Sequence, residues 1–340
     1  MYLNKNGKIL VGAVSFLIGV LALVGLVWLG VKYFPASAQT EAPVENPLEV
    51  ETPPQTHKIK SVELKNPSWS QLWTSTRSLV ESDPILLEEC KNMASNLTTR
   101  VSYDSNKLLK APGNKPKPKA TVVAKDAVSV ALEQANQGKR VLLVNFANNR
   151  RAGNGYDCSE GNGQELDIFR RTTLPFALDY SLKVQPSSVL YPINMEKHDS
   201  NGILTKGVRI IWEKRPGDLY ATVEVPPKID VLSVPAYRNE SKHDAGLFRG
   251  GYFSSFGFTQ EGRTLARKRI ALQIQVAKSL GVDVLVTGAF GCGNCGNKPD
   301  EVAEIFKEVF DDMMDGCSFN IVFAIPESSP EYAIFRDFGF

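Results

Sequence analysis

The chain has few of the residues that usually mark a metal site, a disulfide framework or a nucleic-acid partner. Its 340 residues include five cysteines and three histidines, and the formal net charge is only +2. The cysteines are too scattered for a disulfide framework, and one Cys292-x-x-Cys295 pair without a second pair does not predict a zinc site. His57, His198 and His243 show no metal-ligand spacing. We therefore predict no metal, no cofactor and no nucleic-acid partner.

Two common nucleotide-binding motifs are also missing, although a glycine-rich loop follows a predicted strand. The apolar run at 141–144 predicts a buried strand, and the segment beginning at Gln164 predicts a helix. The loop between them contains no G-x-G-x-x-G and is not followed by Gly-Lys-Ser/Thr, which excludes a dinucleotide fingerprint and a P-loop. A strand, a glycine loop and a helix start can present backbone N–H groups to an anion. The same pattern also occurs in plain turns.

The pattern recurs near the C-terminus. Residues 282–290 predict a second buried strand, residues 291–297 are rich in glycine, and Pro299 opens a helix with an acidic first turn. Because parallel strands end at the same edge of a sheet, both loops are expected on one rim. Two anion-binding loops on one rim suit a diphosphate ligand.

The order of elements predicts an α/β fold with a largely parallel mixed sheet. Strands are predicted at 121–123, 141–144, 188–191, 207–213, 229–234, 282–290 and 318–325. Helices are predicted at 68–98 with a break at Pro84, at 127–137 with Asp126 as N-cap, at 260–280, from Pro299, and at 332–338. A loop is predicted at 112–119.

Both loops resemble those of microbial poly(ADP-ribose) glycohydrolases. Asn145-Phe146-Ala147-Asn148, the loop Gly153-Asn154-Gly155, eight further residues and Gln164-Glu165 are similar to the family motif of three glycines, a short spacer and Gln-Glu-Glu. Gly288-Ala289-Phe290-Gly291-Cys292-Gly293 is similar to the family's second phosphate loop. The resemblance implies a macrodomain-like three-layer α/β fold whose ligand is ADP-ribose or an ADP-ribosylated protein.

The resemblance also implies which residues form the site. Ligand contacts are expected at Asn148, Gly153, Asn154, Gly155, Gln164, Gly291, Cys292, Gly293, Asn294 and Gly296, and Glu165 is the candidate catalytic residue. The chain departs from the family motif in three places. The middle glycine is Asn154, the second glutamate is Leu166, and Asn294-Cys295 replaces bulky apolar residues.

The departure at Leu166 leaves the activity open. Glycosidic cleavage needs a carboxylic acid that protonates the departing oxygen, and the resemblance places that acid where Leu166 stands. Glu165 corresponds to the glutamate that binds the distal ribose, and Asp167 should point elsewhere because one residue turns a helix by about 100°. One hypothesis is an ADP-ribose-binding domain without turnover. A second is a hydrolase that uses Glu165, Asp157 or Glu160, and a third is a membrane-tethered scaffold whose loops are only structural.

The N-terminal part predicts a membrane anchor. Residues 9–31 contain no charged residue, and a helix of that length spans about 35 Å, enough to cross a bilayer. Ala36-Ser37-Ala38 leaves a cleaved signal peptide as the alternative. Lys5 and Lys8 before the segment, against Lys32 after it, favour a single-pass membrane protein with a cytoplasmic N-terminus.

The predicted organisation therefore has five parts. They are a flank at 1–8, a transmembrane helix at 9–33, a Pro/Glu-rich linker at 34–58, a helical lead-in at 59–118 and a glycohydrolase-like macrodomain at 119–340.

Overall fold

The computed structural model describes residues 57–105, 118–158, 161–182, 190–193, 201–238, 253–254, 257–315 and 317–340. The chain divides into two units, Met1–Gln55 and Thr56–Phe340, and every described residue belongs to the second. The predicted membrane helix, nearly all of the linker and most of the loop at 112–119 therefore lie outside the described residues. Among the helices that the structure describes, none is long and apolar enough to cross a membrane.

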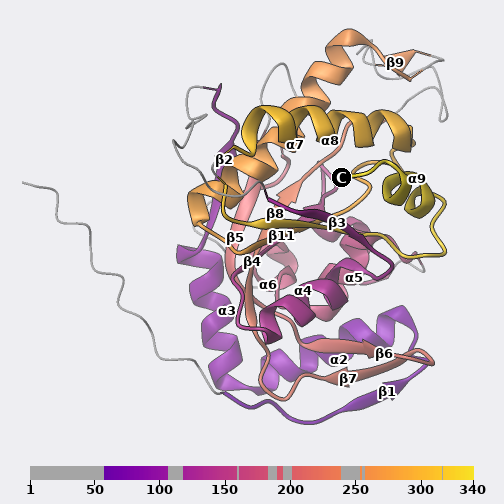
Figure 1. Ribbon diagram of the computed structural model, residues 1–340. Coiled ribbons are helices and arrows are strands. Elements are labelled where there is room, and N and C mark those ends of the chain that lie inside the picture. Colours follow the sequence, from indigo (N-terminus) through magenta and orange to yellow (C-terminus); the bar gives the residue numbers. More distant parts are fainter. Residues whose placement is uncertain are drawn as a thin grey trace, which may run out of the picture. The chain divides into compact units, whose positions relative to one another are not determined.

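A seven-stranded mixed sheet forms the centre of the second unit (Figure 1), with the order β2-β5-β8-β4-β11-β12-β3. Its strands are β2 (Thr98–Ser102), β3 (Ala120–Val123), β4 (Val141–Phe146), β5 (Asn201–Arg209), β8 (Lys228–Val234), β11 (Val284–Thr287) and β12 (Asn320–Ala324). Neighbouring strands from β8 to β3 pair in parallel, whereas β5 is antiparallel to both β2 and β8. The predicted α/β fold with a largely parallel sheet is confirmed.

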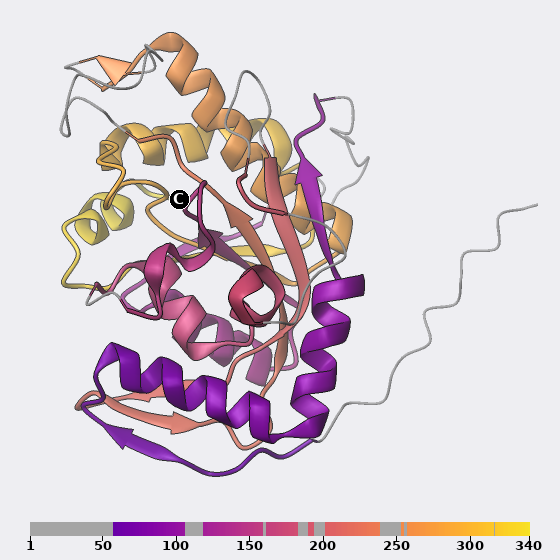
Figure 2. The same cartoon turned by 180° about the vertical axis from the view of Figure 1, so that it is seen from behind.

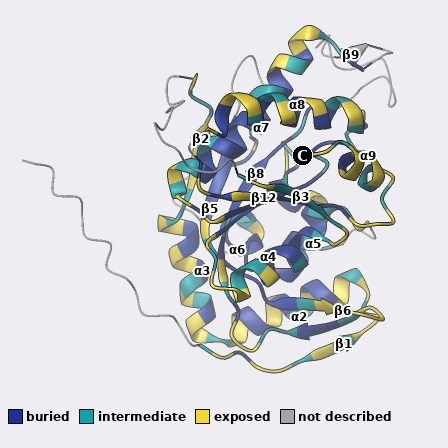
Figure 3. Ribbon diagram, viewed as in Figure 1, coloured by how far each residue is buried: buried dark blue, intermediate teal, exposed yellow. Residues whose placement is uncertain are grey.

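The two faces of the sheet bury separate apolar cores. Along β4, Val141 and Leu143 belong to one core and Leu142 and Val144 to the other, because successive residues of a strand point to opposite faces. The helices that pack on the first face include α4 (Ala127–Asn136), α5 (Gln164–Arg171) and α6 (Pro175–Leu178). Those on the second face include α7 (Gln260–Leu280) and α8 (Pro299–Met313). Figure 2 shows these layers from behind, and Figure 3 shows the buried strands between them.

Asp126 caps a helix as predicted, and Asp83 is a cap that the sequence analysis did not name. The Asp126 carboxylate accepts a hydrogen bond from Ser129 N at 2.8 Å and caps α4. Asp83 separates α2 (Trp69–Ser82) from α3 (Pro84–Asn96) and accepts hydrogen bonds from Ile85 N and Leu86 N. A carboxylate at this position satisfies N–H groups that have no partner inside the helix. The predicted break at Pro84 is therefore confirmed.

A second, three-stranded sheet was not predicted. It has the order β1-β7-β6 and consists of β1 (Glu63–Lys65), β7 (Leu219–Thr222) and β6 (Trp212–Arg215). Figure 1 shows it beside α2, and Trp212 Nε1 donates to Thr76 Oγ1 of that helix at 2.7 Å. The remaining short elements are η2 (Ala152–Gly155), η3 (Tyr180–Leu182), β9 (Phe253–Ser254), β10 (Gly257–Phe258) and α9 (Glu331–Asp337).

Three predicted strands have wrong boundaries. The strand at 207–213 is wrong because Ile210 and Ile211 cross between the two sheets, and Ile211 N donates to Arg171 O of α5 at 2.8 Å. Leu190 and Tyr191, the described part of the strand at 188–191, lie in no strand. The strand at 282–290 covers only β11, because the chain turns after Thr287 into the second glycine loop.

Candidate functional site

The first loop (147–155) and the second loop (288–297) lie on one rim of the sheet, as predicted. They follow β4 and β11, which pair in parallel. The Phe146 and Phe290 rings meet edge to face, with centroids 5.4 Å apart. Ala147 N also donates to Val234 O at 3.1 Å, which joins the first loop to the end of β8. The carboxyl ends of β4, β8 and β11 therefore meet at this rim.

The first loop depends on backbone angles that favour glycine. Gly153, Asn154 and Gly155 have φ of 67°, 46° and 82°, in the left-handed region that Gly adopts freely and Asn tolerates. A Cβ on Gly153 would lie 2.4 Å from the Phe169 ring and 2.5 Å from the Tyr156 ring. Asn154 therefore adopts a backbone conformation that otherwise favours glycine.

Asn148 organises the turn that leads into this loop. Its Oδ1 accepts hydrogen bonds from Arg150 N at 2.8 Å and Arg151 N at 3.0 Å. Its Nδ2 donates to Asn154 Oδ1 at 3.0 Å. An Asn side chain that bonds backbone N–H groups further along the chain stabilises a turn locally.

Glu165 holds the same loop from the first turn of α5. Its Oε2 accepts from Asn148 N at 2.9 Å and its Oε1 from Gly153 N at 3.2 Å. The side chain is only 7% exposed. Burial raises its pKa from 4.5 to about 7, even though hydrogen bonds from Asn148, Gly153 and Asn145 act in the opposite direction. Near neutral pH this carboxyl is therefore close to half protonated.

Two further buried polar groups adjoin Glu165. Asn145 Nδ2 donates to Ser233 Oγ at 3.0 Å, while Asn145 Oδ1 and the Tyr191 hydroxyl have no hydrogen-bond partner among the described residues. Ile193 N donates to Asn149 O at 2.8 Å, which fastens the Tyr191 segment to the first loop. Burial, and then the charge of Glu165, raise the Tyr191 pKa well above its usual value. Sequence reasoning missed Tyr191, because nothing local places a loop tyrosine beside this carboxyl.

Gln164 joins α5 to β4. Its Nε2 donates to Val144 O at 2.6 Å, and its Oε1 accepts from Phe146 N at 2.9 Å. Both polar groups of the amide therefore bond to the β4 backbone in this structure. The expected contact between Gln164 and the ligand stays a prediction.

The second loop folds back on itself around Asn297. Gly291 has φ of 77°, and a Cβ there would lie 2.5 Å from Asn297 Nδ2. Asn297 N donates to Gly291 O at 3.1 Å, and Gly296 N donates to Gly293 O at 2.8 Å. Gly293 is exposed, and a Cβ there would meet nothing within 4 Å. The loop therefore presents Gly293 and Asn294 at its surface.

This loop contains one buried cysteine, Cys292, and one partly buried cysteine, Cys295. Cys292 is 7% exposed, and burial raises its pKa far above the usual value. Burial also raises the pKa of Cys295, which the positive charge of Arg238 lowers and the negative charge of Glu165 raises. Because the charge of Glu165 acts on the Cys295 thiol, the second loop lies near Glu165. All five cysteines are free, and the described residues contain no cluster of His, Cys, Asp and Glu that could hold a metal.

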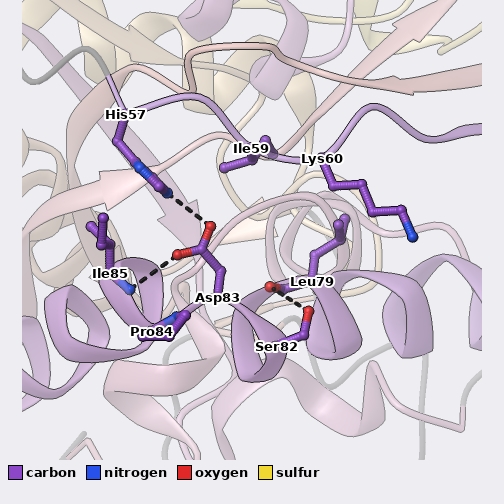
Figure 4. Close-up of a pocket in the computed structure, with 8 residues that line it drawn as sticks. All are labelled: His57, Ile59, Lys60, Leu79, Ser82, Asp83, Pro84 and Ile85. Atoms are coloured by element: carbon purple, nitrogen blue, oxygen red, sulfur yellow. Dashed lines mark hydrogen bonds and ion pairs between the residues drawn. The ribbon is translucent and has the colours of Figure 1, made fainter.

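A separate hollow of about 470 Å³ lies at the junction of α2 and α3 (Figure 4) and contains no residue of either glycine loop. Its walls are formed by His57, Ile59, Lys60, Leu79, Ser82, Asp83, Pro84 and Ile85. His57 Nε2 and Asp83 Oδ2 lie 2.8 Å apart across it, and Asp83 also caps α3. We assign this hollow no ligand.

Residues 83–201 match the family model described as microbial-type PARG, catalytic domain, where PARG stands for poly(ADP-ribose) glycohydrolase. They include the first loop, Glu165 and all of α5. The resemblance noted in the sequence is therefore confirmed. No curated protein sequence matches the chain significantly.

Solved bacterial PARG structures share the fold. The PARG from Thermomonospora curvata is 22% identical with a TM-score of 0.62, and the match covers 80% of this chain and 99% of that one. The same enzyme bound to the inhibitor ADP-HPD is 21% identical, with a TM-score of 0.59 and coverage of 79% and 98%. The PARG from Deinococcus radiodurans in complex with ADP-ribose is 18% identical, with a TM-score of 0.58 and coverage of 73% and 95%. At these identities the likeness shows the fold alone.

Leu166, which stands where the resemblance implies the acid, and the carboxyls considered in its place have different surroundings. Leu166 is 7% exposed and belongs to the apolar core on the α5 face of the sheet. Asp167 Oδ2 lies 2.8 Å from Arg171 Nη1, within a buried ion network. Asp157 is paired with Arg151 at 3.5 Å, and Glu160 lies outside the described residues. Among the described carboxyls considered as the acid, Glu165 is the one that is buried and hydrogen-bonded to the first loop.

Proposed function

We propose that this chain is a membrane-anchored domain of the PARG type that binds ADP-ribose, free or attached to a protein, with hydrolysis weak or lost. The observation that supports binding best is a run of three backbone N–H groups in the second loop without a partner among the described residues. Among the described residues, no hydrogen-bond partner is recorded for the N–H groups of Gly293, Asn294 and Cys295. Successive N–H groups in a glycine-rich turn form a concavity that suits phosphate oxygens.

The first loop supplies the other half of the proposed site. Glu165 accepts the N–H groups of Asn148 and Gly153 and so fixes the loop beside the second one. The diphosphate would lie between the two loops, and Glu165 would face the distal ribose. Because the Glu165 carboxyl is buried and already held by hydrogen bonds, it can accept hydrogen bonds from ribose hydroxyl groups without rearranging when the ligand binds.

Calorimetric titration of the purified full-length chain with ADP-ribose tests the binding. Gly293→Val should weaken binding by more than about tenfold, because the new side chain would occupy the space that the diphosphate approaches. The variant should unfold at the same temperature as the natural chain, since a Cβ at Gly293 meets nothing and Gly293 lacks a positive φ. Absence of heat from the natural chain at millimolar ADP-ribose would remove the proposal.

The loss of turnover rests on Leu166. A general acid typically contributes ~10²–10⁴-fold to a rate, and leucine has no proton to donate. We expect the chain to release ADP-ribose from labelled polymer at least ~10²-fold more slowly than the Thermomonospora curvata enzyme. Leu166→Glu should restore part of the activity, and Leu166→Gln, which has a similar shape but no acid, should not.

One observation favours a second function, an active glycohydrolase that uses Glu165. Burial raises the pKa of Glu165 to about 7, where a carboxylic acid donates a proton efficiently at neutral pH. Under this alternative the natural chain would release ADP-ribose at full speed, and Glu165→Gln would abolish the release. That pair of results would replace the first proposal with the second.

A further inference from the structure

We propose that Arg238 is a ligand-binding residue of this site and that its guanidinium pairs with the diphosphate of ADP-ribose. The proposal rests on the proposed function and adds to the site a cation from outside the two glycine loops. Arg238 lies just beyond β8, the strand that pairs in parallel with β4. Its position on the chain therefore brings it to the rim where both loops lie.

The backbone before Arg238 is packed against the second loop. Tyr237 O accepts a hydrogen bond from Asn297 Nδ2 at 3.1 Å. Ala236 Cβ is so close to Gly291 that a Cβ added there would lie 2.7 Å from it. Residues 236 and 237 are thus held to the loop in which the N–H groups of Gly293, Asn294 and Cys295 have no described partner.

A buried arginine fixes this segment from the other side. Arg269 Nη1 donates to Pro235 O at 2.7 Å, and its guanidinium stacks 4.7 Å from the centre of the Tyr237 ring. Tyr237 is only 6% exposed. The backbone that carries Arg238 is therefore anchored on both sides, so less freedom is lost when its side chain binds.

The Arg238 side chain itself is exposed and forms no ion pair with any residue that the structure describes. Its charge acts on the Cys295 thiol, which also senses Glu165. Most of the other cations near the rim are committed, since Arg151 pairs with Asp157 and Lys298 lies 3.8 Å from Glu301. Arg238 is therefore a positive charge placed beside the anion-binding loops without a described partner.

The chemistry of a diphosphate calls for such a group. Backbone N–H groups supply partial charges, whereas a dianionic diphosphate is bound more tightly when a full positive charge lies next to it. A guanidinium can donate two parallel hydrogen bonds to phosphate oxygens. Lysine keeps the charge but loses this geometry, so Arg238→Lys should bind with intermediate affinity.

Calorimetry on the full-length chain tests the assignment. Arg238→Gln should weaken ADP-ribose binding at least tenfold and leave the unfolding temperature unchanged, because the side chain is exposed. The matched control is Arg215→Gln, which removes the same charge from an exposed arginine on β6 that pairs with Glu63 and Glu213. Since surface charges are screened by salt, the difference between the natural chain and Arg238→Gln should shrink as sodium chloride is raised.

The outcomes separate the two proposals. Tight binding by the natural chain together with equally tight binding by Arg238→Gln would overturn the role of Arg238 and leave the proposed function standing. Equal losses in Arg238→Gln and Arg215→Gln would also overturn it, because the effect would then come from net charge alone. No binding by the natural chain would overturn both proposals.

Discussion

Glu165 ties stability to pH, because its carboxyl is charged in the unfolded chain at a pH where the folded chain still holds its proton. The folded pKa of about 7 exceeds the ordinary value of 4.5, so the folded state binds the proton more tightly. The contribution of Glu165 to stability is fully present below pH 4.5 and is lost as the pH rises to about 7. A shift of that size corresponds to about 3 kcal/mol.

Glu165→Gln isolates this effect, since an amide does not titrate. At pH 4.5 we expect the variant to have a lower free energy of unfolding than the natural chain, because one amide cannot accept both loop N–H groups. As the pH approaches 7, the natural chain should lose up to ~3 kcal/mol of stability that the variant does not lose, so the difference should change by that amount. Urea unfolding at several pH values measures the difference. Glu81→Gln, at an exposed site on α2, serves as the control. A difference between Glu165→Gln and the natural chain that stays constant from pH 4.5 to 7 would contradict the buried, raised-pKa carboxyl.

At the scale of elements, α5 joins the candidate site to the rest of the fold through Arg171. The Arg171 side chain is fully buried and lies 2.7 Å from Asp126 of the α4 cap and 2.8 Å from Asp167. It also donates to Trp212 O at 3.3 Å, at the start of β6. One side chain thus connects α4, α5 and the small sheet.

Arg171→Ala should lower the free energy of unfolding by ~3–5 kcal/mol, because it leaves Asp126 and Asp167 without their counter-charge. Chemical denaturation measures the loss. Arg77→Ala removes an exposed arginine from an i,i+4 pair with Glu81 and should cost at most about 1 kcal/mol. Similar losses in the two variants would show that the buried network does not hold α5 in place.

At the scale of the whole molecule, the prediction concerns the N-terminal segment. Residues 9–31 carry no charge, so the full chain should stay in the membrane fraction after alkaline carbonate washing, which strips peripheral proteins. Deletion of residues 1–56 should release the domain into the soluble fraction. A mature N-terminus at Gln39 would instead show that the segment is a cleaved signal peptide.

Local sequence patterns determined most of the fold. Several features of the fold act through neighbouring residues. They are the apolar runs of β4, β8 and β12, the caps at Asp126 and Asp83, and the glycines of the first loop. Their effects can therefore be read from short windows of sequence. The same locality explains why both loops were expected on one rim, since the order of strands and helices implies parallel pairing.

Only the tertiary structure determined which segments that are distant in the sequence lie side by side. The β1-β7-β6 sheet joins residues near 64 to residues near 220, and no short window contains both. The effect of the Glu165 charge on Tyr191, the hydrogen bond from Asn297 to Tyr237 O and both bonds of the Gln164 side chain to β4 also join distant segments. The raised pKa of Glu165 follows from burial, and burial arises from packing around the carboxyl rather than from its own sequence. The sequence by itself therefore determined the elements and the two glycine loops, whereas packing set the charge and the surroundings of the residues on them.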